Sequence, residues 1–477
     1  MSPFLLYFDK MLLTCCDILL YTELNYIKIQ NYMDEVEVKK VAVINLGCPK
    51  NQVDSEIISG ILAENYSLTS DPAEANIIVI NTCGFIQDAK EESIETILEM
   101  VEFKKNGICE KVLATGCLAQ RYGKELLQEI PELDGILGDG DLRAIPFALE
   151  KANIGKVYTY KECQDFLYTH DMPRIRLSPS YFAYVKIADG CDNRCSYCAI
   201  PQIKGRYRSR PMESIVEEVR NLVQEGGKEI ALIAQDTTRY GLDRYGQPYL
   251  TRLLPEITKI EGLEWIRLMY CYPDAFSEEL IEIVAKEPKI CKYIDLPLQH
   301  ASNAILKKMN RRNTAEEAMD LITKLRQKIP GVFIRSTFIT GFPGETQAQF
   351  QELLDFVRLA KLDRVGVFAY SQEEGTPAAK MKGQIPPEIK NARKEELLAL
   401  QAEVALEVQQ KRIGKVLRVI LEEKISRQEW QGRTEGDAPE IDGQIYLKVK
   451  KQHVAGDIIK ARILEADSFD FKGEGLE

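Results

Sequence analysis

Short apolar runs alternate with stretches of helical periodicity in the first part of this chain. The runs are rich in β-branched residues, as strands are, and the stretches between them repeat apolar residues every three or four positions. From strand to helix in turn, the predicted elements fall at 39–47, 55–64, 76–82, 89–104, 111–116 and 119–129. This order is typical of a parallel sheet with crossover helices. We expect an N-terminal α/β domain at 37–155 and a linker at 156–180.

A second alternation of strands and helices begins near residue 181. Strands are predicted at 182–188, 229–234, 265–270, 293–296, 332–338 and 364–369. Helices are predicted between them at 212–225, 250–259, 277–285, 314–328 and 346–359. Six parallel strands with outer helices indicate an open (β/α)6 barrel at 181–412. It is a partial version of the TIM barrel, in which active sites lie at the carboxyl ends of the strands.

The last part of the chain changes character after a long charged helix predicted at 388–412. Short strand-like runs with turns between them follow at 417–421, 432–434, 441–449 and 458–465. Such runs predict a small antiparallel β-barrel at 413–477. The whole chain is therefore expected to be an α/β multidomain protein.

The first 36 residues are expected to be an extension without a function. Charged residues such as Asp9, Lys10 and Asp17 interrupt their apolar runs, so no segment approaches the ~20 apolar residues that cross a membrane. A basic region and a small-residue cleavage site, which a signal peptide needs, are both missing. Met33 is a candidate for the biological start.

Composition narrows the class of protein further. The 477 residues carry a formal net charge of −11, which argues against non-specific adhesion to nucleic acid or to an anionic membrane. Twelve cysteines are too few for a disulfide scaffold in so long a chain. We therefore expect a cytoplasmic protein whose thiols bind metal or pack in the core.

Cysteines follow each of the first three predicted strands. Cys48, Cys83 and Cys117 are 35 and 34 residues apart in sequence, yet the carboxyl ends of parallel strands share one edge of a sheet. Any one of them alone is expected to be a small buried apolar residue. The three together suggest the ligands of a metal cluster with one open iron.

A second group of cysteines lies just after the first strand of the predicted barrel. Cys191, Cys195 and Cys198 are close enough in sequence for one loop to direct three thiolates at one object. Thiolates select iron–sulfur clusters, zinc or copper(I). An iron–sulfur cluster normally takes four cysteines, so three leave one iron open to a substrate. The alternative is a zinc knuckle, but no further Cys or His occurs before Cys271.

Four basic residues alternate with other residues just beyond this loop. Lys204, Arg206, Arg208 and Arg210 would share one face of an extended segment. They are candidates to bind an acidic group of the substrate; the alternative is a solvated edge.

The cysteine spacing, with the aromatic Tyr197 before the third cysteine, resembles the radical S-adenosylmethionine (SAM) enzymes. The resemblance implies that SAM binds the open iron and that Tyr197 lies beside the cofactor. It further implies that a glycine-rich turn, here Gly226 and Gly227, offers its backbone to the amino group of SAM. The predicted C-terminal barrel is similar to TRAM modules.

These elements in this order resemble the methylthiotransferase family over about residues 39–477. The segments Gly47-Cys-Pro-Lys-Asn51 and Glu435-Gly-Asp-Ala-Pro-Glu-Ile-Asp-Gly443 are similar to its RimO branch. That resemblance implies insertion of a methylthio group at the β-carbon of an aspartate in ribosomal protein S-twelve. It implies two four-iron–four-sulfur (4Fe-4S) clusters, one SAM as radical source and one as methyl donor. The implied partners are ribosomal protein S-twelve or the small ribosomal subunit, and an electron donor such as flavodoxin or ferredoxin.

Two rival functions stay open on the sequence alone. The first is the same chemistry on a tRNA adenosine, and the second is a non-catalytic, ribosome-associated zinc protein. From Gly414 to the end there are 11 Lys or Arg and 13 Asp or Glu, a net charge of −2. A module that binds phosphate backbone is expected to be basic. This favours a protein substrate over a nucleic acid.

Overall fold

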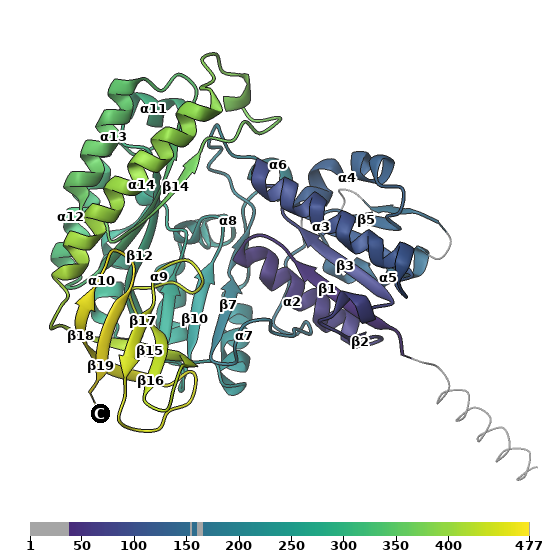
Figure 1. The fold of residues 1–477 in the computed structure, drawn as a ribbon, viewed down its shortest axis with the longest axis horizontal. Helices are drawn as coiled ribbons and strands as arrows, with labels where there is room; N and C mark the ends of the chain where they lie inside the picture. Colours follow the sequence, from purple (N-terminus) through teal and green to yellow (C-terminus); the bar gives the residue numbers. More distant parts are fainter. Residues whose placement is uncertain (1–37, 153–154, 160–165, 477) are drawn as a thin grey trace, which may run out of the picture.

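The computed structural model describes residues 38–152, 155–159 and 166–476. Figure 1 shows three parts: an N-terminal α/β domain, a central parallel sheet with helices along its outer side, and a small C-terminal barrel. The predicted fold class is confirmed. The predicted extension at 1–36 lies outside the described residues. Within the described part of the chain, no helix combines the length and the apolar character that a membrane crossing requires.

The N-terminal sheet has six strands, and all of its neighbouring strands are parallel. In sheet order these are β2 (Ser67–Leu68), β1 (Lys40–Asn45), β3 (Ile77–Thr82), β4 (Lys111–Gly116), β5 (Gly135–Leu137) and β6 (Val157–Thr159). The prediction of a linker at 156–180 needs correction, because β6 lies inside that stretch and pairs with β5. A strand of three residues is too short to leave a recognisable period in the sequence.

Helices cover both faces of this sheet, so the first four residues of its central strand β3, Ile77–Ile80, are all apolar. Ile78 and Ile80 of β3 pack in the cluster that includes α3 and α4, whereas Ile77 and Val79 pack in the cluster on the opposite face. A parallel strand buried on both sides shows a continuous apolar run for this reason. The helices are α2 (Pro49–Ala63), α3 (Gln87–Asn106), α4 (Cys117–Glu129) and α5 (Ile145–Lys151).

Two of these helices begin at or directly after a cysteine. Helix α2 starts at Pro49, directly after Cys48, and not near residue 55 as predicted. Proline is favoured in the first turn of a helix, where its missing N–H is not needed. Helix α4 starts at Cys117, after Gly116 with φ +88°. The cysteines therefore lie at sharp turns from strand into helix.

The central domain is a six-stranded, wholly parallel sheet that does not close on itself. Its order is β14 (Arg364–Ala369), β13 (Phe333–Thr340), β12 (Ile290–Gln299), β11 (Trp265–Leu268), β10 (Glu229–Ile233) and β7 (Phe182–Lys186). The outer helices are α7 (Met212–Gln224), α9 (Leu250–Thr258), α10 (Glu278–Lys286), α12 (Ala315–Lys328), α13 (Gln347–Ala360) and α14 (Pro387–Gln410). Shorter elements in the connections are β8 (Ala188–Asp189), β9 (Arg208–Ser209), α6 (Ile200–Ile203), α8 (Leu242–Tyr245) and α11 (Asn303–Lys308).

The C-terminal module is a closed five-stranded barrel. In barrel order the strands are β15 (Val416–Lys424), β16 (Glu429–Thr434), β17 (Ile445–Lys448), β19 (Phe471–Gly475) and β18 (Ile458–Ala466). The expected antiparallel pattern holds for every pair except β17 and β19, which are parallel. The sequence pattern also missed β19, because its Phe-Lys-Gly-Glu-Gly residues hold a single large apolar side chain.

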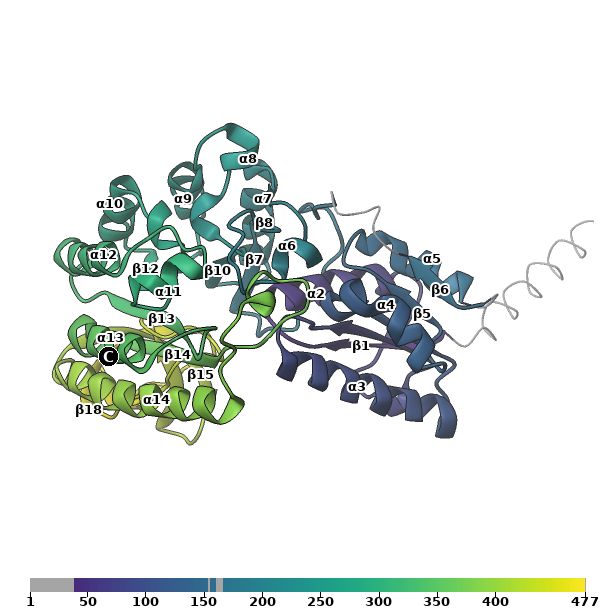
Figure 2. The same ribbon diagram turned by 90° about the horizontal axis from the view of Figure 1, so that it is seen from above.

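The three parts share one apolar core on the inner face of the central sheet. Ile57 of α2, Trp265 of β11 and Trp430 of β16 all belong to it. Figure 2 shows α2 at the junction between the N-terminal domain and the central sheet, where it contacts β7. At the seam with the C-terminal barrel, the buried carboxylate of Glu229 accepts from Arg267 and Arg433 at 2.8 and 2.7 Å.

A chain that starts at Met33 is expected to be soluble, to bind its metal clusters and to turn over normally. The first strand begins at Lys40, and all six candidate cysteine ligands lie beyond it. Iron content and activity of the shortened protein measure this. A chain that starts at Gly47 is the control. It lacks β1, which lies between β2 and β3, and it should not fold. Loss of cluster binding in the Met33 chain would contradict the prediction.

Candidate active site and metal centres

Three cysteines lie at the carboxyl edge of the N-terminal sheet. Cys48 follows β1, Cys83 follows β3 and Cys117 follows β4, and these three strands are neighbours in the sheet. The carboxyl ends of neighbouring parallel strands form one edge. The structure thus places the three predicted ligands on the same edge. We call these three cysteines the N-terminal triad.

The loops of the N-terminal triad pack closely against each other. Gly47 has φ +90°, and a Cβ atom there would lie 2.9 Å from Sγ of Cys83. The side chain of Asn51 donates from Nδ2 to the carbonyl oxygen of Thr82 at 3.1 Å, and its Oδ1 accepts from Sγ of Cys117 at 3.8 Å. Asn51 therefore connects the loops after β1, β3 and β4.

Burial favours the protonated form of two of these thiols, those of Cys83 and Cys117, when no metal is bound. It raises the pKa of Cys83 to about 11 and holds the pKa of Cys117 well above its usual value. Metal ions bind the thiolate and displace its proton. Among the described residues, no three His, Cys, Asp or Glu side chains are arranged as a preformed metal site. The fit to a cluster rests on the shared edge of the thiols and on their soft-ligand chemistry.

The second triad, Cys191, Cys195 and Cys198, lies on one curled loop between β8 and α6. Gly190 enters the loop with φ +75°, where a Cβ atom would lie 2.0 Å from the carbonyl oxygen of Arg206. The Cys198 N–H donates to the carbonyl of Cys195 at 3.1 Å. Burial raises the pKa of Cys191 to about 11, and it also raises the pKa of Cys198. We call this group the core triad.

Two polar side chains that could not be identified from the sequence contact the core triad. The hydroxyl of Tyr272 lies 3.0 Å from Sγ of Cys195, and Nη1 of Arg311 lies 3.9 Å from the same sulfur. The guanidinium of Arg311 also stacks 3.9 Å from the centre of the Tyr272 ring. Hydrogen bonds to cluster sulfurs tune reduction potentials. Neither residue belongs to a motif, so only the fold could reveal them.

The carboxyl end of β10 also meets the core triad. Asn193, inside the cysteine loop, donates from Nδ2 to Asp236 at 2.7 Å, and Asp236 is fully buried. The Oδ1 atom of Asn193 and the Oε1 atom of Gln235 are buried without a hydrogen-bond partner among the described residues. Unpaired acceptors of this kind fit a ligand that brings N–H groups.

The glycine-rich turn predicted to contact SAM lies elsewhere. Gly226 and Gly227 precede β10, and the adjacent Lys228 N–H donates to the carbonyl of Tyr181, just before β7. They are therefore at the amino ends of the strands, opposite the core triad. This placement speaks against the predicted contact with SAM, because the cysteine loop follows the carboxyl end of β7.

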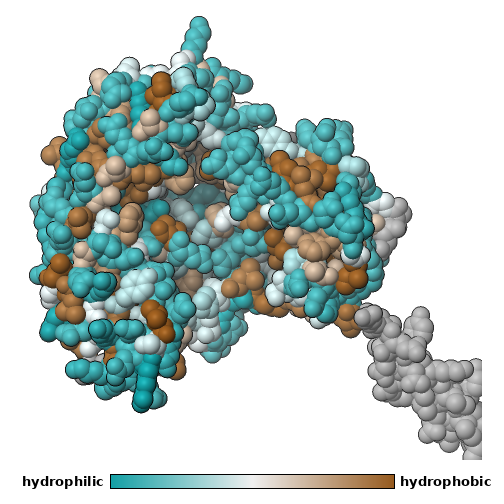
Figure 3. All heavy atoms as spheres, viewed as in Figure 1, coloured by the Kyte–Doolittle hydropathy of each residue, from teal (hydrophilic) through white to brown (hydrophobic). Residues whose placement is uncertain are grey.

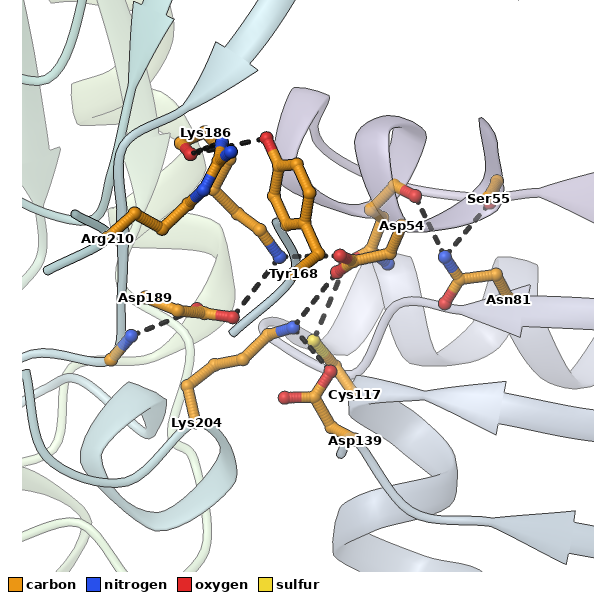
Figure 4. Close-up of polar contacts among 12 residues, drawn as sticks. Asp54, Ser55, Asn81, Cys117, Asp139, Tyr168, Lys186, Asp189, Lys204 and Arg210 are labelled. Atoms are coloured by element: carbon orange, nitrogen blue, oxygen red, sulfur yellow. Dashed lines mark hydrogen bonds and ion pairs between the residues drawn. The ribbon is translucent and has the colours of Figure 1, made fainter. Parts of the chain in front are cut away.

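The four alternating basic residues do not share one face. Gly205 has φ +72°, and Lys204 still has helical backbone angles at the end of α6. Lys204 and Arg210 are buried and ion-paired, whereas the side chain of Arg206 is 90% exposed. Figure 4 shows Lys204 among Asp54, Asp139 and Asp189, between the two domains. This separates the predicted group into structural and surface residues.

A cavity of about 350 Å³ lies where all three domains meet. Phe85, two residues after Cys83, and Tyr197, next to Cys198, line the same cavity, as does Ile441 of the C-terminal module. Figure 3 shows this face of the molecule hollowed between the N-terminal domain and the rest. Of the residues predicted from sequence, Tyr197 borders this central cavity. Arg206 and Arg208 instead line another hollow, of about 710 Å³, beside Asn193.

Family models match all three parts of the chain. The radical SAM superfamily matches residues 185–357, the TRAM domain matches 413–475, and the uncharacterized protein family UPF0004 matches 40–138. The ribosomal protein uS12 methylthiotransferase RimO of Desulfitobacterium hafniense is 54% identical over 92% of this chain and 99% of its own length. The chain belongs to the RimO family. The RimO of Desulforamulus reducens is 52% identical over 91% of this chain and 99% of its own length.

A solved structure outside the RimO family shares the overall fold. The radical SAM methyltransferase TsrM of Kitasatospora setae, with cobalamin and a 4Fe-4S cluster bound, superimposes with a TM-score of 0.53. The superposition covers 72% of this chain and 77% of TsrM at 16% sequence identity. At that identity the likeness supports the fold of the RimO family member and not its substrate.

Proposed function

We propose that this protein inserts a methylthio group at the β-carbon of an aspartate in ribosomal protein uS12. The observation that carries the proposal is the central cavity, which lies next to a residue of each triad loop. A substrate side chain there can face both triads at once. Membership of the RimO family, whose named relatives are uS12 methylthiotransferases, supports the same substrate.

The core triad would hold one 4Fe-4S cluster with SAM, and the N-terminal triad would hold a second 4Fe-4S cluster. When bound, these groups supply a radical that removes hydrogen from an unactivated C–H bond, and a methylated sulfur to replace it. A second SAM is the methyl donor. The cofactors carry this chemistry, and the protein contributes binding, orientation and exclusion of water.

The protein's own residues shape the space in which the reaction occurs. Phe85, Tyr197 and Phe368 give the cavity an apolar lining, which keeps water from a reactive radical. Tyr272 and Arg311 contact the sulfur of Cys195. Asn51 fixes the spacing of the N-terminal triad. These contacts fit a site in which two metal centres face one substrate.

The setting follows from the substrate. We propose a cytoplasmic enzyme that acts on uS12 or on the small ribosomal subunit, with flavodoxin or ferredoxin as electron donor. The negative charges of the whole chain and of its C-terminal module speak against tRNA as the substrate. Iron and labile sulfide in the purified protein separate the enzyme from a zinc protein, since zinc alone would overturn the proposal.

Cells that contain this protein are expected to carry uS12 heavier by one CH2S unit, the result of a methylthio group replacing hydrogen on an aspartate. Mass spectrometry of uS12 and of tRNA from cells with and without the gene measures this. Binding of tRNA by the purified protein should be weak, because the chain carries a net charge of −11 and affinity for a phosphate backbone depends on basic contacts. Methylthioadenosine in tRNA together with unmodified uS12 would contradict the proposal.

A further inference from the structure

Arg335 lies on β13 in the wall of the central cavity, and its side chain is 14% exposed. Two acidic side chains contact its guanidinium group. Its Nη1 donates to Asp295 of the neighbouring strand β12 at 3.0 Å, and its Nε lies 3.5 Å from Asp442 of the C-terminal module. Asp295 and Arg335 are register partners in the sheet. The guanidinium is therefore fixed in direction before any substrate arrives.

One nitrogen of this guanidinium is left for a ligand. No hydrogen bond joins Nη2 of Arg335 to any residue that the structure describes, and Nη2 is not among the atoms sealed from solvent. Gly366 stands beside it on β14, where an added Cβ atom would lie 3.4 Å from Nη2. The missing side chain leaves space beside Nη2.

The groups behind Arg335 are themselves firmly held. Asp442 accepts from the hydroxyl of Tyr293 at 2.7 Å and from the N–H of Ala438 at 2.9 Å. Asp295 accepts from the N–H of Tyr270 at 2.9 Å. Preorganised donors lose little entropy when they bind, and a guanidinium matches the geometry of a carboxylate better than an ammonium does. This side of the cavity is built to receive a carboxylate.

The two acidic neighbours do not make the cavity repel an anion. Burial raises the pKa of Asp442 above its usual value, which favours its neutral form. A further basic side chain, that of Lys50, interacts electrostatically with Asp295. The Nζ of Lys50 is 2.9 Å from the centre of the Tyr270 ring, and Tyr270 borders the cavity. Arg335 and Lys50 together offset the charge of Asp295.

We propose that Arg335 binds the carboxylate of the substrate aspartate and that Asp442 positions the Arg335 side chain, so that the C-terminal module completes the substrate site. The inference rests on the proposed function and adds the residue that selects the amino acid. A carboxylate held at Nη2 keeps the attached β-carbon inside the cavity that both triad loops border. The same chemistry could be offered by the methionine carboxylate of SAM, and the experiment separates these two sources.

The test compares binding of uS12 with its target aspartate intact or changed to Asn, as free protein and in small subunits, to cluster-loaded enzyme. The wild-type enzyme should bind the Asp form about 10- to 100-fold more tightly, as expected for a hydrogen bond to a charged group. The Arg335→Met enzyme should bind both forms equally. Arg335→Lys keeps a positive charge beside Asp295 and Asp442, and it should retain part of the preference. Arg312→Met, at the other hollow, should retain all of it.

Each outcome decides between the sources. Equal binding by Arg335→Met with unchanged SAM affinity supports the proposal. A preference that survives in both Arg335 variants overturns it, and so does a loss of SAM affinity with the preference intact, which would assign the carboxylate to SAM. If Arg335→Met does not fold, Arg335→Lys decides alone. A preference for the Asp form smaller than that of the wild type supports the proposal, and an unchanged preference overturns it. Failure of the proposed function would appear differently, as unmodified uS12 with the wild-type enzyme.

Discussion

Replacing Cys191, Cys195 and Cys198 with Ala is expected to leave about half of the iron and to abolish cleavage of SAM. Two triads imply two four-iron clusters, about eight irons per chain in protein reconstituted without oxygen. The core triad lies on a loop of its own, separate in sequence from the turns after β1, β3 and β4 that carry the other triad, so its loss should leave the N-terminal cluster in place. Iron and sulfide analysis, with an assay for 5′-deoxyadenosine, measures both effects.

The complementary triple variant gives the second half of this prediction. Ala at Cys48, Cys83 and Cys117 should also leave about half of the iron, yet it should retain SAM cleavage while methylthio transfer to uS12 is lost. Ala at Cys109 is the matched control, because that thiol is buried in the outer core of the same domain. It should keep all of the iron. Full iron content in either triple variant would refute the assignment of that triad.

The elements that carry the triads were predictable from sequence because each depends on neighbours along the chain. The strands before Cys48, Cys83 and Cys117 are apolar runs, and parallel topology then places their ends on one edge. The core triad is local to a single loop. No long-range information was needed to find these six residues, although strands β6 and β19 left no pattern to detect.

The rest of the site depends on contacts between distant segments. Arg335 and Asp442 belong to different domains, and only the packing of the C-terminal module against the central sheet brings them together. Tyr272 and Arg311 reach Cys195 from separate loops in the same way. A buried arginine with an open nitrogen and a solvated one look identical in a sequence.

The alternating basic residues illustrate the opposite error. A period of two predicts one shared face only if the backbone is extended throughout. Here α6 extends to Ile203, and Gly205 turns the chain with a positive φ. Lys204 therefore points to the N-terminal domain while Arg206 points to solvent. The same segment thereby acquires a different role, because it connects the two triads.

Helix α6 links the two triads. It begins directly after Ala199, next to Cys198, and both Ala199 and Ile203 pack in one cluster with Cys117 of the N-terminal triad. Lys204 follows at its end. The ammonium of Lys204 pairs with Asp139, just beyond β5, and lies 3.5 Å from Asp54 of α2. All three charged groups are largely buried, so the pairing holds the N-terminal domain against the core triad.

Replacing Lys204 with Met is expected to lower stability by about 3–5 kcal/mol, because it removes the ion-pair partner of the largely buried Asp139, whereas Asp54 keeps its pair with Lys186. The shift of the denaturation midpoint measures this loss. The variant should also make fewer methylthio products per SAM cleaved, since the two triads lose their fixed spacing. Lys204→Arg, which keeps the charge, should recover part of both.

Arg206→Met is the matched control for this change. It lies two residues further along the same segment, its side chain is 90% exposed, and its closest acidic partner is 3.9 Å away. Exposed pairs contribute little, so its stability should stay within about 0.5 kcal/mol of the wild type. If Lys204→Met and Arg206→Met unfold at the same denaturant concentration, the buried pairing does not hold the domains together. Unchanged stability with a reduced transfer ratio would instead place Lys204 at the substrate, as the sequence pattern predicts.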